Sequence, residues 1–218
     1  MDGNGRWAKE RALPRSEGHR AGTEAAREVV KYCRKSGIEY LTLYTFSREN
    51  WSRPREEVSF LFDLLKKFLK KELSTLMERD IRLNILGDVD PLPRMTKRVV
   101  EQVCSKTAGN SGMQLNLALN YSGRHEIVRA CRRLLSEGVV PGRVDEDMFS
   151  GYLYTAGQPD PDLVIRTSGE KRLSNYLLYQ AAYTEFYFTD VLWPDFGPEE
   201  LSAALEDFSR RQRRFGDI

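Results

Sequence analysis

Residues 23–46, TEAAREVVKYCRKSGIEYLTLYTF, decide the fold class, because two kinds of periodicity meet in them without a linker. From Thr23 to Ser36 apolar residues recur at helical spacing, and Gly37 ends this pattern. The following IEYLTLYTF is rich in β-branched and aromatic residues, which favour a buried strand. The stretch therefore predicts a helix that leads directly into a strand.

The same order of elements recurs along the chain. A long amphipathic helix is predicted at 58–79, before the strand IRLNILG, and another at 93–107, before the strand MQLNLALNY. Further helices are predicted at 124–137, at 145–154 and from Glu199 onward, and further strands at DLVIRT and EFYFT. Such alternation is typical of parallel sheets. We therefore expect an α/β fold with a central, mostly parallel sheet flanked by helices.

Length and composition narrow the class of protein. The 218 residues suit one domain, 1–218, and no apolar run approaches the roughly 20 residues that span a bilayer. The net charge of +2 gives no argument for general nucleic-acid binding. Cys33, Cys104 and Cys131 form no CxxC pair, which fits a reducing compartment and disfavours a disulfide framework or a zinc site. Without a signal-peptide pattern, a cytoplasmic location is expected.

The opening DGNGRWA, residues 2–8, combines a carboxylate, two glycines and an arginine. Backbone N–H groups can approach an anion closely at such glycines, while Arg6 neutralises the anion and Asp2 holds a cation. Taken alone, the segment is more often an ordinary turn. In parallel α/β folds a phosphate-binding loop follows a strand, and none precedes this one. We therefore expect that the first strand is missing from this chain.

A second polar cluster follows the strand that ends at Phe46. The segment SRENWSRP begins there, and Arg15, His19 and Arg20 precede the strand's helix. Ligands of parallel sheets bind beyond the carboxyl ends of strands, so a site is expected here. A capped turn is the structural alternative for this segment.

A third cluster follows the strand DLVIRT, where Arg166, Arg172 and Ser174 surround a glycine. Two guanidinium groups and a hydroxyl suit the oxygens of a diphosphate, although a solvated basic loop fits this segment equally well. Glu185 lies within the apolar run AAYTEFYF, where a buried carboxylate needs a cation. Either a salt bridge or a Mg²⁺ ion would provide one.

The predicted helix at 58–79 has a wide apolar face, formed by Val58, Leu61, Phe62, Leu65, Phe68 and Leu69. Such a face normally packs in the core, and it is also compatible with the wall of a lipid tunnel. Neither His19 nor His125 has metal-ligand spacing, and neither Ser47 nor Ser174 lies in a nucleophile elbow. Zinc chemistry and serine hydrolysis are therefore unsupported.

Taken together, several motifs resemble those of undecaprenyl diphosphate synthases, which are cis-prenyltransferases. The resemblance runs from Met1 to about Gly216, with the motifs in order: MDGNGRWA, GHRAG, LTLYTFSRENWSRP, LNLALNYSGR, DLVIRTSGEKRLSNYLLYQAAYTEFYFTDVLWPDF and RRFG. It implies a transferase that condenses isopentenyl diphosphate with an allylic diphosphate such as farnesyl diphosphate. The product would be a long polyprenyl diphosphate such as undecaprenyl diphosphate, a lipid carrier for the cell wall, and the growing chain would occupy a hydrophobic tunnel.

The resemblance also implies roles for matching residues. Asp2 would be catalytic and would bind Mg²⁺ together with Glu185, while Asn50 would assist proton removal, the final proton acceptor being left open. The allylic site would comprise Gly3, Asn4, Gly5, Arg6, Trp7, Arg15, His19, Ser47, Arg48, Glu49, Trp51 and Arg53. The isopentenyl diphosphate site would comprise Arg166, Arg172, Leu173, Ser174, Arg214 and Gly216. A small residue at Thr45 would leave room for a longer product.

The resemblance implies a homodimer, in which the terminal Arg214 and Gly216 of one subunit extend across the interface. A lipid product allows a loose peripheral association with a membrane.

Two other classes of function compete with this interpretation. A non-catalytic subunit of a heteromeric prenyltransferase would lack the catalytic carboxylate, whereas this chain has Asp2. An RNA-binding module has support only from RRQRR and the arginine loop, without an aromatic stacking motif, so no nucleic-acid partner is expected.

Overall fold

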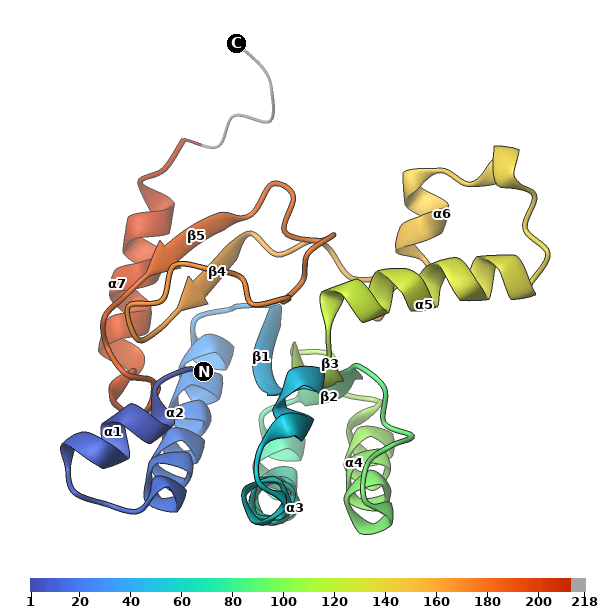
Figure 1. Ribbon diagram of the computed structural model, residues 1–218. Coiled ribbons are helices and arrows are strands. Elements are labelled where there is room, and N and C mark those ends of the chain that lie inside the picture. The colour runs from blue at the N-terminus through green and yellow to red at the C-terminus, as the bar shows by residue number, and fades with distance from the viewer. Residues whose placement is uncertain (213–218) are drawn as a thin grey trace.

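The computed structural model describes residues 1–212, and their strands form two parallel sheets (Figure 1). The larger sheet contains β1 (Tyr40–Ser47), β3 (Met113–Tyr121) and β2 (Ile81–Leu86), in that order. The smaller sheet pairs β4 (Leu163–Arg166) with β5 (Glu185–Phe188). Every strand pairing is parallel, which confirms the predicted α/β class. The strands are divided between two sheets, whereas the sequence suggested one.

Helices cover the larger sheet and connect its strands. Figure 1 shows α2 (Arg15–Lys35), α3 (Arg55–Glu78) and α4 (Arg94–Thr107) on one side of it. On the other side α5 (Gly123–Ser136) leads away from β3 towards the short α6 (Glu146–Ser150), and α7 (Pro198–Ser209) lies beside β5. The remaining elements are short: α1 (Asn4–Glu10), η1 (Arg48–Ser52), η2 (Pro141–Arg143) and η3 (Trp193–Asp195). None of the helices within residues 1–212 has the length and hydropathy needed to cross a bilayer.

The two faces of the larger sheet differ in polarity, because side chains alternate along each strand. Leu43 and Leu117 are register partners, and both belong to the main hydrophobic core. One residue earlier, Thr42, Asn116 and Asn84 form a polar row across β1, β3 and β2. Asn116 is 1 % exposed; its Oδ1 accepts from Asn84 at 2.8 Å, and its Nδ2 donates to Thr42 Oγ1 at 3.1 Å. A buried amide is thereby satisfied within the sheet.

The same amide also anchors the segment that precedes β4. Asn116 Nδ2 donates to Gln158 Oε1 at 2.7 Å, so the centre of the larger sheet holds the chain shortly before it enters the smaller one. This contact helps to fix the position of β4, and with it the carboxyl-terminal Arg166 of that strand.

Helix α2 begins at Arg15, well before the predicted start at Thr23, and α1 was not predicted. Gly18 and Gly22 interrupt the helical pattern in the sequence, because glycine is a weak helix former. Both glycines are needed for close packing of α1 on α2. A Cβ atom at Gly18 would lie 1.9 Å from the carbonyl oxygen of Asn4, and one at Gly22 would lie 2.1 Å from Asn4 Oδ1.

This packing predicts that Gly18→Ala destabilises the protein. The new methyl group would meet backbone, which cannot move aside without shifting α1, so we expect the free energy of unfolding to fall by about 1–3 kcal/mol. Urea denaturation monitored by circular dichroism would measure the change. Gly142→Ala is the matched control, since no heavy atom lies within 4 Å of the added Cβ. Equal stabilities of the two variants would contradict the proposed packing.

Candidate active site

A cavity of about 1440 Å³ lies between β1 and β4. It is lined by every residue from 39 to 47 and from 159 to 167. A strand that lined a cavity with one face would contribute only alternate residues, so the outer edges of the two strands must border this space. The cavity is larger than the roughly 300–1,000 Å³ of ordinary small-molecule pockets, and it has room for a long ligand.

One part of the cavity is apolar. Helix α2 contributes Ala26, Val29 and Cys33, and α3 contributes Leu61, Phe62, Leu65 and Phe68. Most of the predicted apolar face of α3 therefore lines the cavity, while Val58 and Leu69 lie in the core. This part of the cavity suits a hydrocarbon chain.

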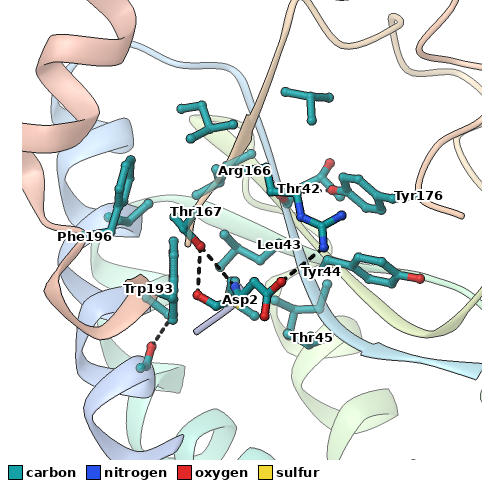
Figure 2. A pocket seen from close by; sticks show the side chains of 18 of the residues that line it. Asp2, Thr42, Leu43, Tyr44, Thr45, Arg166, Thr167, Tyr176, Trp193 and Phe196 are labelled. Atoms are coloured by element: carbon teal, nitrogen blue, oxygen red, sulfur yellow. Dashed lines mark hydrogen bonds and ion pairs between the residues drawn. The ribbon is translucent and has the colours of Figure 1, made fainter. Parts of the chain in front are cut away.

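Polar groups gather where β1 and β4 end, and Asp2 lies among them (Figure 2). The Asp2 carboxylate accepts from Arg166 Nη2 at 3.1 Å through Oδ2, and from the Gly3 N–H at 2.8 Å through Oδ1. Its backbone is held as well, because the carbonyl oxygen accepts from Thr167 Oγ1 at 2.9 Å and from the Trp193 N–H at 3.0 Å. The side chain is still 43 % exposed, so a ligand can reach the carboxylate.

The glycine-rich segment after Asp2 begins in a conformation that few residues adopt. Gly3 has a φ of 105°, and a Cβ atom there would lie 2.2 Å from Ser168 Oγ. Arg6 Nη1 donates to the carbonyl oxygen of Ser168 at 2.8 Å, which draws the segment against the loop after β4. Asn4 Oδ1 is buried, and no partner for it lies within the described residues. Such an atom is costly unless a ligand or water satisfies it.

Glu57 holds two guanidinium groups and an imidazole beside this segment. Its Oε1 lies 3.0 Å from Arg53 Nη1, 3.2 Å from Arg15 Nε and 3.5 Å from His19 Nε2. One carboxylate cannot neutralise both arginines, so the cluster can accept an anion. Glu57 is not among the site residues predicted from the sequence, although its position four residues after Arg53 at the start of a helix is a recognisable ion-pair spacing.

His19 is neutral at neutral pH in this arrangement. Burial is the main cause that lowers the pKa of its imidazole below the ordinary value, and the charges of Arg53 and Arg15 lower it further. Glu57 acts in the opposite direction. A ligand that brings negative charge to this cluster would therefore raise the pKa of His19.

Asn50 belongs to η1, directly after β1. Its Oδ1 accepts from the Ser47 N–H at 3.1 Å as part of a capping box that fixes η1 at the end of the strand. Within residues 1–212 no partner is found for the amide N–H₂, so this group can donate to a ligand. A carboxamide is not basic, so Asn50 can orient a substrate but cannot itself hold a proton from it.

The third predicted cluster is assembled at the end of β4. Arg166 Nη1 donates to Ser174 Oγ at 2.8 Å and to the carbonyl oxygen of Arg172. Arg172 pairs with Glu170, and both Arg172 and Leu173 line the cavity. The guanidinium of Arg166 thus contacts both Asp2 and the loop that carries Ser174. The cluster predicted at residues 2–8 and the cluster predicted after the strand DLVIRT therefore form one site.

Most predicted site residues line the cavity: Asp2, Gly3, Asn4, Gly5, Arg6, Arg15, His19, Ser47, Asn50, Arg53, Arg166, Arg172, Leu173 and Ser174.

Five others do not line it. Trp7 donates to Asp195 Oδ1 at 2.6 Å, Arg48 lies 3.7 Å from Asp88, and Glu49 accepts from Asn175 at 2.7 Å. Trp51 donates to Asn120 on β3, and Glu185 Oε2 lies 2.8 Å from Arg211 Nη1. Arg214 and Gly216 lie outside the described residues.

The acidic residues present suit a metal that the substrate helps to hold. Within residues 1–212 no three His, Cys, Asp or Glu side chains come together as a metal site. Mg²⁺ often binds through one or two carboxylates and takes its other ligands from substrate phosphates and water. The exposed Asp2 carboxylate, set among cationic side chains, fits that arrangement. Glu185 is engaged by Arg211, and its predicted metal role stays a prediction.

Comparison with known proteins gives a consistent result. Residues 1–216 match the family model described as "Putative undecaprenyl diphosphate synthase". Isoprenyl transferases from Heliobacterium mobile and Aquifex aeolicus are 53% and 47% identical to it; each alignment covers all of this chain, and 85% and 94% of the respective relative.

Two solved structures are similar throughout. Lavandulyl diphosphate synthase from Lavandula x intermedia, in complex with dimethylallyl diphosphate, has a TM-score of 0.96 at 36% identity, covering 100% of this chain and 95% of that one. A probable undecaprenyl diphosphate synthase from Campylobacter jejuni has a TM-score of 0.81 at 32% identity, covering 90% and 92%. The chain therefore belongs to the isoprenyl transferase family of the undecaprenyl diphosphate synthase type.

Proposed function

We propose that this prenyl-transferring enzyme condenses isopentenyl diphosphate with an allylic diphosphate, farnesyl diphosphate being the expected primer, to make a long polyprenyl diphosphate such as undecaprenyl diphosphate. The observation that carries the proposal is the polarity of the cavity. Cationic side chains gather at the strand ends, and apolar side chains of α2 and α3 line the space beyond them. A ligand with a charged head and a long apolar tail fits both parts.

The allylic diphosphate is assigned to the segment after Asp2 and to the cationic cluster around Glu57. Gly3, Asn4 and Gly5 allow close approach of the backbone, and Arg15 and Arg53 supply positive charge. His19 becomes charged when a bound diphosphate raises its pKa. The similar structure of lavandulyl diphosphate synthase contains dimethylallyl diphosphate, an allylic diphosphate, which supports this class of substrate.

Isopentenyl diphosphate is assigned to the neighbouring cluster of Arg166, Arg172 and Ser174, next to Leu173. Arginine forks and a hydroxyl match the oxygens of a diphosphate. Arg214 and Gly216 would complete this pocket across the interface of a homodimer.

In the reaction, the bond between C1 of the allylic chain and its diphosphate breaks while the isopentenyl double bond forms a new carbon–carbon bond at C1. A proton then leaves the isopentenyl unit, and a cis double bond results. Arg6, Arg15 and Arg53 stabilise the negative charge that grows on the departing diphosphate. Asn50 orients the isopentenyl group through its amide N–H₂. Mg²⁺ bound at Asp2 would supply further stabilisation of the leaving diphosphate.

The enzyme is proposed to act in the cytoplasm as a homodimer, with loose attachment to the membrane that receives its lipid product. The alternative role, a non-catalytic partner subunit, is disfavoured because Asp2, Asn50 and Arg53 are all present and line one cavity.

The first prediction concerns Asp2→Asn. This change removes the charge that would bind Mg²⁺ and preserves the size of the side chain, so we expect incorporation of isopentenyl diphosphate to fall by about 10²-fold or more. The assay supplies farnesyl diphosphate, radiolabelled isopentenyl diphosphate and Mg²⁺, and resolves products by length. An unchanged rate would remove the proposed role of Asp2, and absence of activity in the folded parent would favour the partner-subunit role.

The second prediction concerns pH. His19 is neutral in the free protein because its pKa is lowered, and a bound diphosphate would raise that pKa, so binding should take up protons near pH 7. Affinity should accordingly weaken as the pH rises from about 6 to 8, by linkage. Calorimetric titrations in buffers of different ionisation enthalpy measure the uptake. His19→Gln corrects for protons taken up by the diphosphate itself, and equal uptake by both proteins would contradict the assignment.

The third prediction concerns product length. Ala26 lies on α2 in the apolar part of the cavity, so Ala26→Leu should shorten this space and shift the products towards shorter chains. Ala203→Leu, at an exposed position of α7, is the control for an added leucine and should leave the product distribution unchanged. An unaltered distribution for Ala26→Leu would place the hydrocarbon tail elsewhere.

A further inference from the structure

Trp51 lies behind the cavity wall. Its ring packs against Phe46 and Phe62, with a centroid distance of 5.3 Å in each case, and both of these residues line the cavity while Trp51 does not. Trp51 is also the residue that directly follows Asn50 in η1. An interaction that holds the indole of Trp51 therefore also holds η1. This element carries Asn50, and Arg53 follows it directly.

The indole is fixed by a buried residue on another strand. Trp51 Nε1 donates to Asn120 Oδ1 at 2.9 Å, and Asn120 is 2 % exposed. The other end of the same amide donates from Nδ2 to the carbonyl oxygen of Asp88 at 2.7 Å. Asn120 thus connects η1 with the loop after β2, and it uses both ends of its side chain.

The backbone at Asn120 is specialised for this connection. The pairing of β1 with β3 is irregular here, since Tyr44 is aligned with Ala118, Phe46 with Leu119 and Ser47 with Tyr121. Asn120 has no partner in this register, and its φ of 49° lies in the left-handed region. Asparagine adopts this region more readily than most residues, and its amide provides both a donor and an acceptor.

The loop after β2 packs closely against the backbone of β3 next to Asn120. Gly87 has a φ of 135°, and a Cβ atom there would lie 2.0 Å from the carbonyl oxygen of Leu119. The carboxyl ends of β1, β2 and β3 therefore meet around Asn120, which bonds Trp51 of η1.

We propose that Asn120 is a positioning residue for the transfer reaction, which acts through Trp51 to hold η1 so that Asn50 and Arg53 face the substrates. The inference rests on the proposed roles of Asn50 and Arg53. Asn120 does not line the cavity and needs no contact with a substrate. Instead, Asn120 prevents η1 from shifting at the end of β1. This restraint matters because small displacements of reacting groups reduce turnover strongly.

The test uses Asn120→Gly, because glycine adopts the left-handed backbone without strain and loses only the amide. We expect kcat to fall by about tenfold or more while the KM for isopentenyl diphosphate, bound on the β4 side, changes by less than about twofold. Trp51→Phe keeps the ring contacts and removes the N–H donor, so it should lower kcat in the same way. The double variant should be no slower than the slower single variant, because both changes break one hydrogen bond.

Two comparisons separate positioning from general stability. Asn110→Ala is the matched control, since Asn110 Nδ2 also bonds backbone carbonyl oxygens, those of Ile81 at 2.8 Å and Leu76 at 3.1 Å, but lies away from the cavity. It should lower the melting temperature and leave kcat unchanged. In an Asn50→Ala background, Asn120→Gly should reduce kcat by a clearly smaller factor than in the parent, because one of the two groups that it positions is already gone.

The outcomes are distinct. If Asn50→Ala lowers kcat but Asn120→Gly and Trp51→Phe do not, the positioning role is wrong and the proposed function stands. Equal effects of Asn120→Gly in the parent and in the Asn50→Ala background would also overturn the role, because they would indicate a general loss of structure. If Asn50→Ala itself leaves kcat unchanged, both the assignment of Asn50 and the inference built on it fail.

Discussion

The site depends on the way in which the first residues of the chain are held against β4. The backbone of Asp2 bonds Thr167 and Trp193, and its carboxylate pairs with Arg166, so residues more than 160 positions apart in the sequence meet at one point. Hydrogen bonds to both backbone and side chain leave Asp2 little freedom. This contact brings the glycine segment, the end of β4 and η3 together, and α1 then packs on α2 through glycines that leave no room for a Cβ.

Around this contact the positively charged side chains outnumber the carboxylates that pair with them. Glu57 pairs with both Arg15 and Arg53 and also contacts the neutral His19, while Asp2 pairs with Arg166. In the free protein these carboxylates keep the cations in place. A diphosphate carries several negative charges and competes for the same groups, so binding exchanges ion pairs within the protein for stronger ones with the ligand. Preorganised cations of this kind stabilise charge that develops in a reaction without further rearrangement.

The sequence was sufficient for the α/β class and for the strands, and most of the site residues predicted from it line the cavity, because periodicity and the carboxyl-end rule are local or topological properties. It failed where a residue's role depends on a distant partner. Gly18 and Gly22 weaken the helical pattern that they belong to, since their purpose is contact with Asn4. Glu57 resembles any helix-start carboxylate, and Asn120 resembles any strand-end asparagine, until the side chains that each one holds are brought near by the fold.

Arg166 links the two halves of the proposed reaction. Its guanidinium bonds Asp2 through Nη2 and Ser174 through Nη1, so it borders both the pocket assigned to the allylic diphosphate and the one assigned to isopentenyl diphosphate. Two diphosphates side by side repel each other, and a shared cation between them reduces that repulsion. In the proposed cycle, the lengthened chain would carry the diphosphate of the isopentenyl unit after each condensation, and this diphosphate would have to move to the allylic pocket before the next one. A cation that contacts both pockets would favour such a short transfer, while the apolar part of the cavity would accommodate the longer tail.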